Sequence, residues 1–147
     1  MSYAELRQRG KLKVYQAKPE EIKRLLQVAQ RDLVAAERNL PEDSDWSFTM
    51  AYNAVLQAAR ALMFSQGYRP RGKDQHRTVV RFTELTLGHE YQQQMALFDQ
   101  MRRKRNRLIY EAVGLVSRQE AEQALAFAET FVERIRLLST GQLRLDM

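Results

Sequence analysis

Apolar residues recur every three or four positions along most of this chain, which is the spacing of helices that bury one face. Start and stop signals divide the pattern: Pro19 opens the first segment, and Ser117 and Glu120 have capping-box spacing at the start of the last. The connections are short, so successive helices are expected to be antiparallel neighbours. The sequence therefore predicts an all-α, up-down four-helix bundle with one extra short helix. The predicted segments are 19–40, 43–67, 74–87, 90 to about 112, and 117 onward.

The two ends of the chain do not continue this pattern. Residues 1–17 carry only scattered apolar side chains, and we expect them to form a short helix or an extended arm docked on the bundle. Residues 18–140 would form the bundle domain and residues 141–147 a C-terminal tail. This organisation predicts one folded domain, as expected for a chain of 147 residues.

The second predicted helix has an unusually wide apolar surface. A strip of small residues runs along it, and larger apolar side chains such as Tyr52, Leu56 and Met63 lie beside that strip. Small residues let helix axes approach closely, so the segment suits a central bundle helix or a dimer interface that continues beyond the core. The small residues are Ala51, Ala54, Ala58 and Ala61.

The composition of the chain argues against several classes of protein, including disulfide-bonded, metal-binding and membrane proteins. The chain has no cysteine, which excludes disulfides and thiolate metal sites. Neither His76 nor His89 has a carboxylate at the helical spacing of metal ligands, so we expect no metal and no cofactor. The N-terminus lacks the apolar region of a signal peptide, and no segment approaches about 18 uninterrupted apolar residues. We therefore expect a cytoplasmic protein without a membrane partner.

The most informative segment is Met101–Tyr110, where five cations fall within six residues. At about 100° per residue, Arg105 falls in the middle of the apolar arc of this helix. Because an arginine keeps its charge, an inward-facing guanidinium needs an acceptor there. One explanation is an ion pair with Glu129 of the last helix, and the other is a site formed by Arg105 with Asn106 and Tyr110.

Basic residues gather in two parts of the sequence, and the net charge of +6 is a weak indication of a nucleic-acid partner. One group lies on the same helix as Arg105, and the other lies in and after the loop that precedes the third predicted helix. Both are candidates for binding RNA or phosphate. The candidate residues are Arg102, Arg103, Arg107, Arg71, Lys73 and His76.

Several segments together resemble the HEPN family, whose members are small prokaryotic helical bundles often encoded beside minimal nucleotidyltransferases. The similar segments are Trp46–Phe48, Ala51–Ala59, Gly67–Pro70 and Arg102–Tyr110, and the resemblance covers roughly residues 19–138. In active members, an arginine followed by a polar residue and then a histidine forms the motif of a metal-independent endoribonuclease. Two subunits present this motif to each other.

The resemblance assigns Arg105 to the arginine position, Asn106 to the polar position and Tyr110 to the position of the histidine. A phenol has a pKa near 10, so only about a thousandth is ionised at neutral pH. Loss of a general acid or base lowers a rate by about 10²- to 10⁴-fold. The catalytic motif Arg105, Asn106 and Tyr110 is therefore predicted to be degenerate and without nuclease activity.

Three functions follow as hypotheses. The first is a homodimeric binding or regulatory module that partners a nucleotidyltransferase in a toxin–antitoxin or stress and defence pair, with RNA or a nucleotide as ligand. The second is an endoribonuclease toxin in which Tyr110, or His76 arriving from its loop, takes the part of the missing histidine. The third is a basic nucleic-acid-binding protein that uses both groups of cations.

Overall fold

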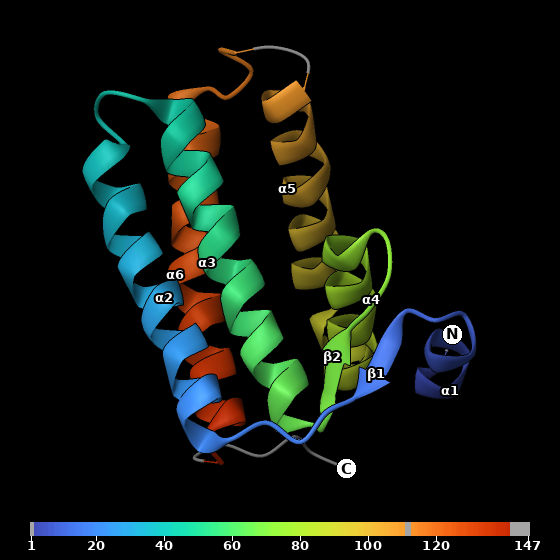
Figure 1. The fold of residues 1–147 in the computed structure, drawn as a ribbon. Helices are drawn as coiled ribbons and strands as arrows, with labels where there is room; N and C mark the ends of the chain where they lie inside the picture. Colours follow the sequence, from blue (N-terminus) through green and yellow to red (C-terminus); the bar gives the residue numbers. More distant parts are fainter. Residues whose placement is uncertain (1, 111–112, 142–147) are drawn as a thin grey trace.

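The computed structural model describes residues 2–110 and 113–141, and it has the predicted all-α architecture (Figure 1). A bundle of long helices is accompanied by a short N-terminal helix and by one small two-stranded sheet. The elements in chain order are α1 (Tyr3–Gln8), β1 (Leu12–Val14), α2 (Pro19–Asn39), α3 (Ser44–Ser65), β2 (Tyr68–Pro70), α4 (Gln75–Leu87), the 3₁₀ turn η1 (His89–Tyr91), α5 (Gln92–Tyr110) and α6 (Arg118–Ser139).

The helix boundaries follow the start signals in the sequence. Helix α2 begins at Pro19, and the Asp43 carboxylate caps α3 by accepting from the backbone N–H of Trp46 at 3.0 Å. Ser117 and Glu120 form the predicted capping box of α6. Helix α5 begins at Gln92, because residues 89–91 form the separate turn η1; its predicted end near residue 112 lies outside the described residues.

The small sheet is an element that the helical periodicity does not predict. Strands β1 and β2 pair antiparallel, with Leu12 opposite Pro70 and Val14 opposite Tyr68. Three-residue strands carry too little alternation to be distinguished from loops. The sheet ties the N-terminal segment to the connection between α3 and α4, and the Tyr3 ring of α1 stacks on Phe82 of α4 with centroids 4.6 Å apart.

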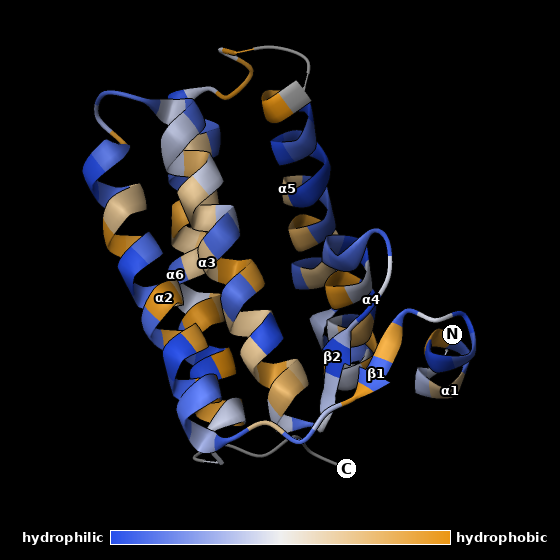
Figure 2. Cartoon of the chain, in the orientation of Figure 1, coloured by the Kyte–Doolittle hydropathy of each residue, from blue (hydrophilic) through white to orange (hydrophobic). Residues whose placement is uncertain are grey.

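Helix α3 lies at the centre of the fold, with α2 and α6 beside it and α4 and α5 on its other side (Figure 1). Its small-residue strip is wholly buried, which confirms the prediction of a central helix. Figure 2 shows polar residues covering much of α2 and much of the upper half of α5, while apolar residues collect along α3 and α6. None of the described helices has the length and apolar character needed to cross a membrane.

Candidate functional site

The two halves of α5 pack differently against the rest of the bundle. The first half buries Met95, Phe98 and Met101. From Arg102 to Ile109 every side chain is partly or well exposed. Since arginine cannot shed its charge, the cation-rich half of α5 cannot pack as closely on α3 as an apolar helix would. The candidate site lies between this half of α5 and α3.

Arg105 lines a groove of about 690 Å³ between the start of α3 and the end of α5. Two apolar side chains on its rim, Trp46 and Ile109, are each about half exposed, at 49% and 50%. The Asp45 carboxylate also lines the groove, but it accepts from the backbone N–H groups of Gly114 and Val116 and so holds the chain between α5 and α6. The groove therefore combines the apolar side chains of Trp46 and Ile109 with the cation of Arg105 and the carboxylates of Asp43 and Asp45.

The Arg105 guanidinium is half-buried and faces α3. Its Cζ lies 6.0 Å from the centroid of the Tyr52 ring, and its Nη1 donates to Oδ1 of the adjacent Asn106 at 3.4 Å. Glu129 is exposed on α6, and Arg105 forms no ion pair within residues 2–110 and 113–141. The ion pair considered as an alternative is thus not formed.

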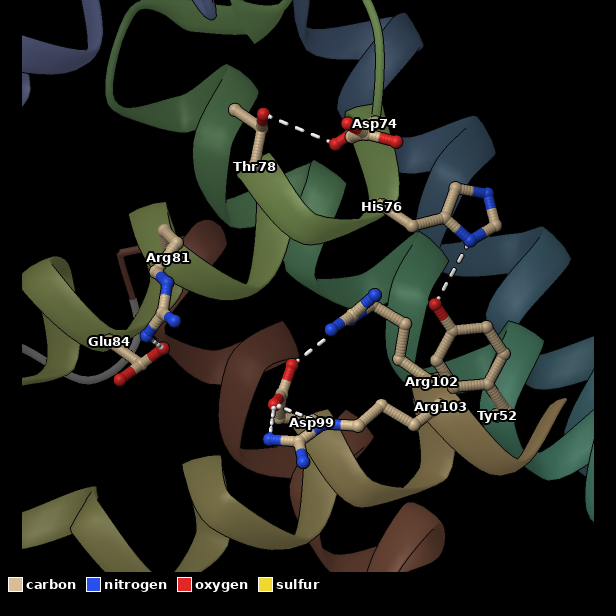
Figure 3. Close-up of polar contacts among 9 residues, drawn as sticks. All are labelled: Tyr52, Asp74, His76, Thr78, Arg81, Glu84, Asp99, Arg102 and Arg103. Carbon is tan, nitrogen blue, oxygen red and sulfur yellow. Dashed lines mark hydrogen bonds and ion pairs between the residues drawn. The ribbon is translucent and has the colours of Figure 1, made fainter. Parts of the chain in front are cut away.

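Tyr52 joins α3 to the start of α4. Its hydroxyl and Nδ1 of His76 form a hydrogen bond of 3.0 Å (Figure 3). Burial raises the pKa of the Tyr52 phenol, although the charges of Arg105 and Arg102 oppose this, so the phenol stays protonated. Burial also lowers the pKa of His76, and the charges of Arg105, Arg60 and Arg102 lower it further. His76 is therefore neutral at pH 7 and surrounded by cations.

Asp99 organises two of the cations on α5. Its carboxylate accepts from Nε of Arg102 at 3.0 Å and from Nε of Arg103 at 3.0 Å (Figure 3). Burial opposes the charge of Asp99, but these hydrogen bonds outweigh it and lower its pKa. Arg103 is exposed, whereas only 16% of the Arg102 side chain is exposed. The bond through Nε leaves the terminal nitrogens of Arg102 without a partner among the described residues.

The remaining candidate residues do not all join this cluster. Arg107 is exposed on α5, and Tyr110 ends α5 with a side chain outside the described part of the chain. Arg71 and Lys73 are exposed beyond β2 and contact the N-terminal segment instead: the Arg71 N–H donates to the Lys11 carbonyl at 2.8 Å, and the Lys73 carbonyl accepts from Lys11 Nζ at 3.3 Å. The structure therefore brings His76, but not Arg71 or Lys73, into contact with the residues around Arg105.

Three polar residues of α3 that the sequence interpretation missed form a series of hydrogen bonds that begins beside the Arg105 groove, which Asn53 lines. The buried Asp32 of α2 accepts from Asn53 Nδ2 at 2.5 Å. Asn53 Oδ1 accepts from Gln57 Nε2 at 3.4 Å, and Gln57 Oε1 accepts from Arg60 Nη1 at 3.0 Å. The available signal was their i, i+4, i+7 spacing, which places them on one face of a helix otherwise rich in alanine.

Comparison with family models gives a match to the HEPN domain over residues 22–138. The chain belongs to the HEPN domain family. The matched region begins within α2 and ends within α6, so it contains the predicted motif on α5 and the residues around Arg105. No curated protein matches the chain. Membership of the HEPN family is consistent with a nuclease-like or a regulatory module.

The residues that the structure describes include no group of three or more histidine, cysteine, aspartate or glutamate side chains placed to hold a metal ion. The chemistry available around Arg105 is instead that of fixed positive charge, a protonated phenol and a neutral imidazole. Such a set suits recognition of an anion.

Proposed function

We propose that this HEPN domain is a binding or regulatory module that holds RNA through its phosphates between α3 and α5. The observation that carries the proposal is the half-buried guanidinium of Arg105, which has no carboxylate partner in the described ranges. A phosphate supplies the acceptor that such a guanidinium lacks, and arginine binds phosphate through two parallel N–H donors.

Neighbouring residues suit the same ligand. Asp99 accepts a hydrogen bond from Nε of Arg102. The terminal nitrogens of Arg102 are therefore already positioned toward the space beside Tyr52 and His76 (Figure 3). Because the position of Arg102 is fixed before binding, little side-chain entropy is lost when an anion arrives. Arg107 and the exposed Arg103 would add long-range attraction that depends on salt.

We infer from the resemblance that Tyr110 stands at the position of the histidine of active HEPN ribonucleases, and a tyrosine there supports a role without RNA cleavage. The Tyr52 phenol beside Arg105 offers no ready base, because burial raises its pKa and keeps it protonated, and a tyrosine ordinarily titrates near 10. The ligand would therefore be held rather than cut.

A dimer and a protein partner extend the same proposal. The half-exposed Trp46 and Ile109 on the rim of the Arg105 groove would face a second copy of the chain, as the motifs of active HEPN members do. The family resemblance further suggests a nucleotidyltransferase as partner in a toxin–antitoxin or stress and defence pair, in the cytoplasm. Sedimentation of the pure chain tests the dimer: a 17.3 kDa species at every concentration would refute it.

Fluorescence anisotropy with a labelled single-stranded RNA tests the binding function. Arg105→Gln is expected to weaken binding about ten- to a hundredfold, because hydrogen bonds between charged groups contribute about 1.5–3 kcal/mol. The matched control is Arg118→Gln, which removes the same charge from an exposed pair with Glu122 on α6. Absence of RNA binding by the wild-type chain, or equal binding by both variants, would contradict the proposal.

The position of His76 favours a second candidate function, an endoribonuclease in which His76 replaces the missing histidine. His76 is neutral at pH 7 and lies close enough to Arg105 and Arg102 for their charges to lower its pKa. It would act as the base for the ribose 2′-hydroxyl, and Arg105 would stabilise the developing charge. Cleavage of RNA that is lost in both His76→Ala and Arg105→Ala would establish this function, and intact RNA after long incubation with the wild-type chain would exclude it.

A further inference from the structure

A second pair of arginines is held by aromatic rings at the C-terminal end of α3. The Arg60 guanidinium lies over the Phe64 ring, with Cζ 5.7 Å from the centroid, and the Phe64 and Tyr15 ring centroids are 5.3 Å apart. Arg69 of β2 lies over the other ring, with Cζ 5.1 Å from the Tyr15 centroid. The four side chains come from α3, β2 and the segment after β1, so the fold itself brings the two cations together.

Neither guanidinium has an acidic partner in the part of the chain that the structure describes. Arg60 donates only to the amide oxygen of Gln57 at 3.0 Å. Burial lowers the pKa of Arg60, and the charge of Arg69 lowers it further. The Glu21 carboxylate accepts from the Tyr15 hydroxyl and from the Lys18 backbone N–H, at 3.2 Å for the latter, and the charge of Arg69 contributes to lowering its pKa. Arg60 and Arg69 therefore lie close enough for their charges to interact, and neither forms an ion pair among the described residues.

Arg60 lies on the same face of α3 as Asn53, which lines the groove of Arg105, and hydrogen bonds run from Asn53 through Gln57 to Arg60. The charge of Arg60 also contributes to lowering the pKa of His76, as do the charges of Arg105 and Arg102. Arg60 is eight residues beyond Tyr52 on α3, which corresponds to about 12 Å along the helix axis. The arginine pair of Arg60 and Arg69 thus lies nearer the C-terminal end of α3 than the groove of Arg105 does.

We propose that Arg60 and Arg69 form a second phosphate subsite, so that the ligand is a single RNA strand whose separate phosphodiesters reach from Arg105, past His76, to Arg60. The inference rests on the proposed binding function and adds a direction and a length to the ligand. Arg60 lies about 12 Å beyond Tyr52 along the axis of α3, whereas the two phosphates of a pyrophosphate group share one bridging oxygen, so a longer ligand suits the two sites better. Stacking on Phe64 and Tyr15 holds both guanidiniums in place before the strand binds.

Binding of labelled single-stranded RNA oligonucleotides of increasing length tests the second subsite. The variant Arg60→Gln/Arg69→Gln is expected to weaken binding of a long oligonucleotide at least tenfold and to leave binding of a dinucleotide, measured by NMR, unchanged. The dependence of binding on salt should also become weaker. For each phosphate that the variant no longer neutralises, the slope of log K against log salt concentration should decrease in magnitude by about 0.7. Arg118→Gln on α6 is the charge-matched control, and ATP is the competitor for a pyrophosphate ligand.

The outcomes separate this inference from the proposed function. If Arg105→Gln weakens RNA binding but Arg60→Gln/Arg69→Gln binds as the wild-type chain does, with an unchanged salt slope, the second subsite is refuted and the binding function stands. If only the Arg60 and Arg69 variant loses RNA, the role of Arg105 is refuted instead. Competition by ATP as strong as that of the oligonucleotide would overturn the single-strand ligand. Arg69 is exposed, so Arg69→Gln alone keeps the test usable if Arg60 is needed for folding.

Discussion

Helices α5 and α6 both pack on α3, but they do so in different ways. Helix α6 buries side chains along its whole length, from Ala121 to Ile135. The buried side chains of α5 stop at Met101, and the described side chains after it stay partly exposed. The apolar contacts of α6 thus run from end to end, whereas those of α5 are concentrated in its first half. The second half of α5 is held by partly buried Leu108 and by the ion pair of Lys104 with Glu120 of α6.

This difference explains where the candidate site lies. Burial of apolar area stabilises a helix contact by about 25 cal/mol per Å², whereas a buried charge without a partner is strongly unfavourable. The sequence Arg102–Arg107 gives α5 cations where α6 has alanine, leucine and phenylalanine. The second half of α5 therefore packs less closely on the core, with Leu108 as its partly buried contact, and presents Arg102 and Arg105 to Tyr52 and His76. Helix α6 is packed along its whole buried face, whereas the second half of α5 leaves space beside α3 for a ligand.

The largest expected effect comes from removing the attachment of α5. Phe98 is wholly buried, and its ring centroid lies 6.0 Å from that of Tyr52 and 6.1 Å from that of Phe131. Phe98→Ala is expected to lower the free energy of unfolding by about 3–5 kcal/mol. It should also weaken RNA binding, because Arg102 and Arg105 lose their support. Urea unfolding measures the first effect, and a decrease of less than about 1 kcal/mol would show that α5 is not anchored there.

A matched pair of neighbours on α3 tests its two faces. Ala58 is wholly buried, so Ala58→Leu is expected to overpack the core and lower the free energy of unfolding by about 1–3 kcal/mol. Gln57 is only half-buried, and Gln57→Tyr likewise adds three heavy atoms, with an expected decrease of about 1 kcal/mol or less that includes the lost hydrogen bonds to Asn53 and Arg60. Thermal unfolding of both variants gives the comparison. Equal destabilisation would mean that the two faces of α3 are packed alike.

Much of the fold could be predicted because the signals are local. Pro19, Asp43 and Ser117 mark helix starts through their own backbone and side-chain chemistry, and the alanines of α3 indicate a central helix. The sheet of β1 and β2 could not be predicted in this way. Its pairing joins Leu12 to Pro70 across most of the N-terminal half of the chain, and nothing in either three-residue segment specifies the partner.

The candidate site was predictable only in part, for a related reason. Position on the helical wheel identifies Arg105 as an inward-facing cation, since that depends on a single helix. The contact of Tyr52 with His76 depends on how α4 returns toward α3, which no local pattern contains. Arg60 was missed because one charged residue on an alanine-rich helix is typical of an exposed position. Its significance appears only when Phe64, Tyr15 and Arg69 are placed around it.

A smaller effect is expected at the start of α6. The Ser117 hydroxyl accepts from the Glu120 N–H at 3.1 Å, and the Glu120 side chain accepts from the Ser117 N–H at 3.2 Å. Ser117→Ala removes the first of these bonds, so a decrease of about 1 kcal/mol in the free energy of unfolding is expected. Gln119→Ala, at an exposed position of the same turn, should change it by less than about 0.5 kcal/mol. Indistinguishable results from the two variants would remove the capping box as a source of α6 stability.

The smallest expected effect is a change in the pKa of His76, which lies beside Tyr52 on the side of α3 that faces α5. Burial and the charges of Arg105, Arg60 and Arg102 hold the pKa of His76 below its ordinary value of 6.5. A lowered pKa means that folding favours the neutral form of His76. This contribution to stability is present above pH 6.5 and is lost as the pH falls through the folded pKa.

Arg105→Gln should therefore raise the pKa of His76, as measured by NMR titration of the imidazole, and Arg118→Gln on α6 should not. Binding of RNA to the wild-type chain should raise it too, because a phosphate beside Arg105 favours the protonated imidazole. If the pKa of His76 is the same in the wild-type chain, in Arg105→Gln and with RNA bound, then His76 does not interact with the cations of α5. The hypothesis that His76 and Arg105 share one site would then be wrong.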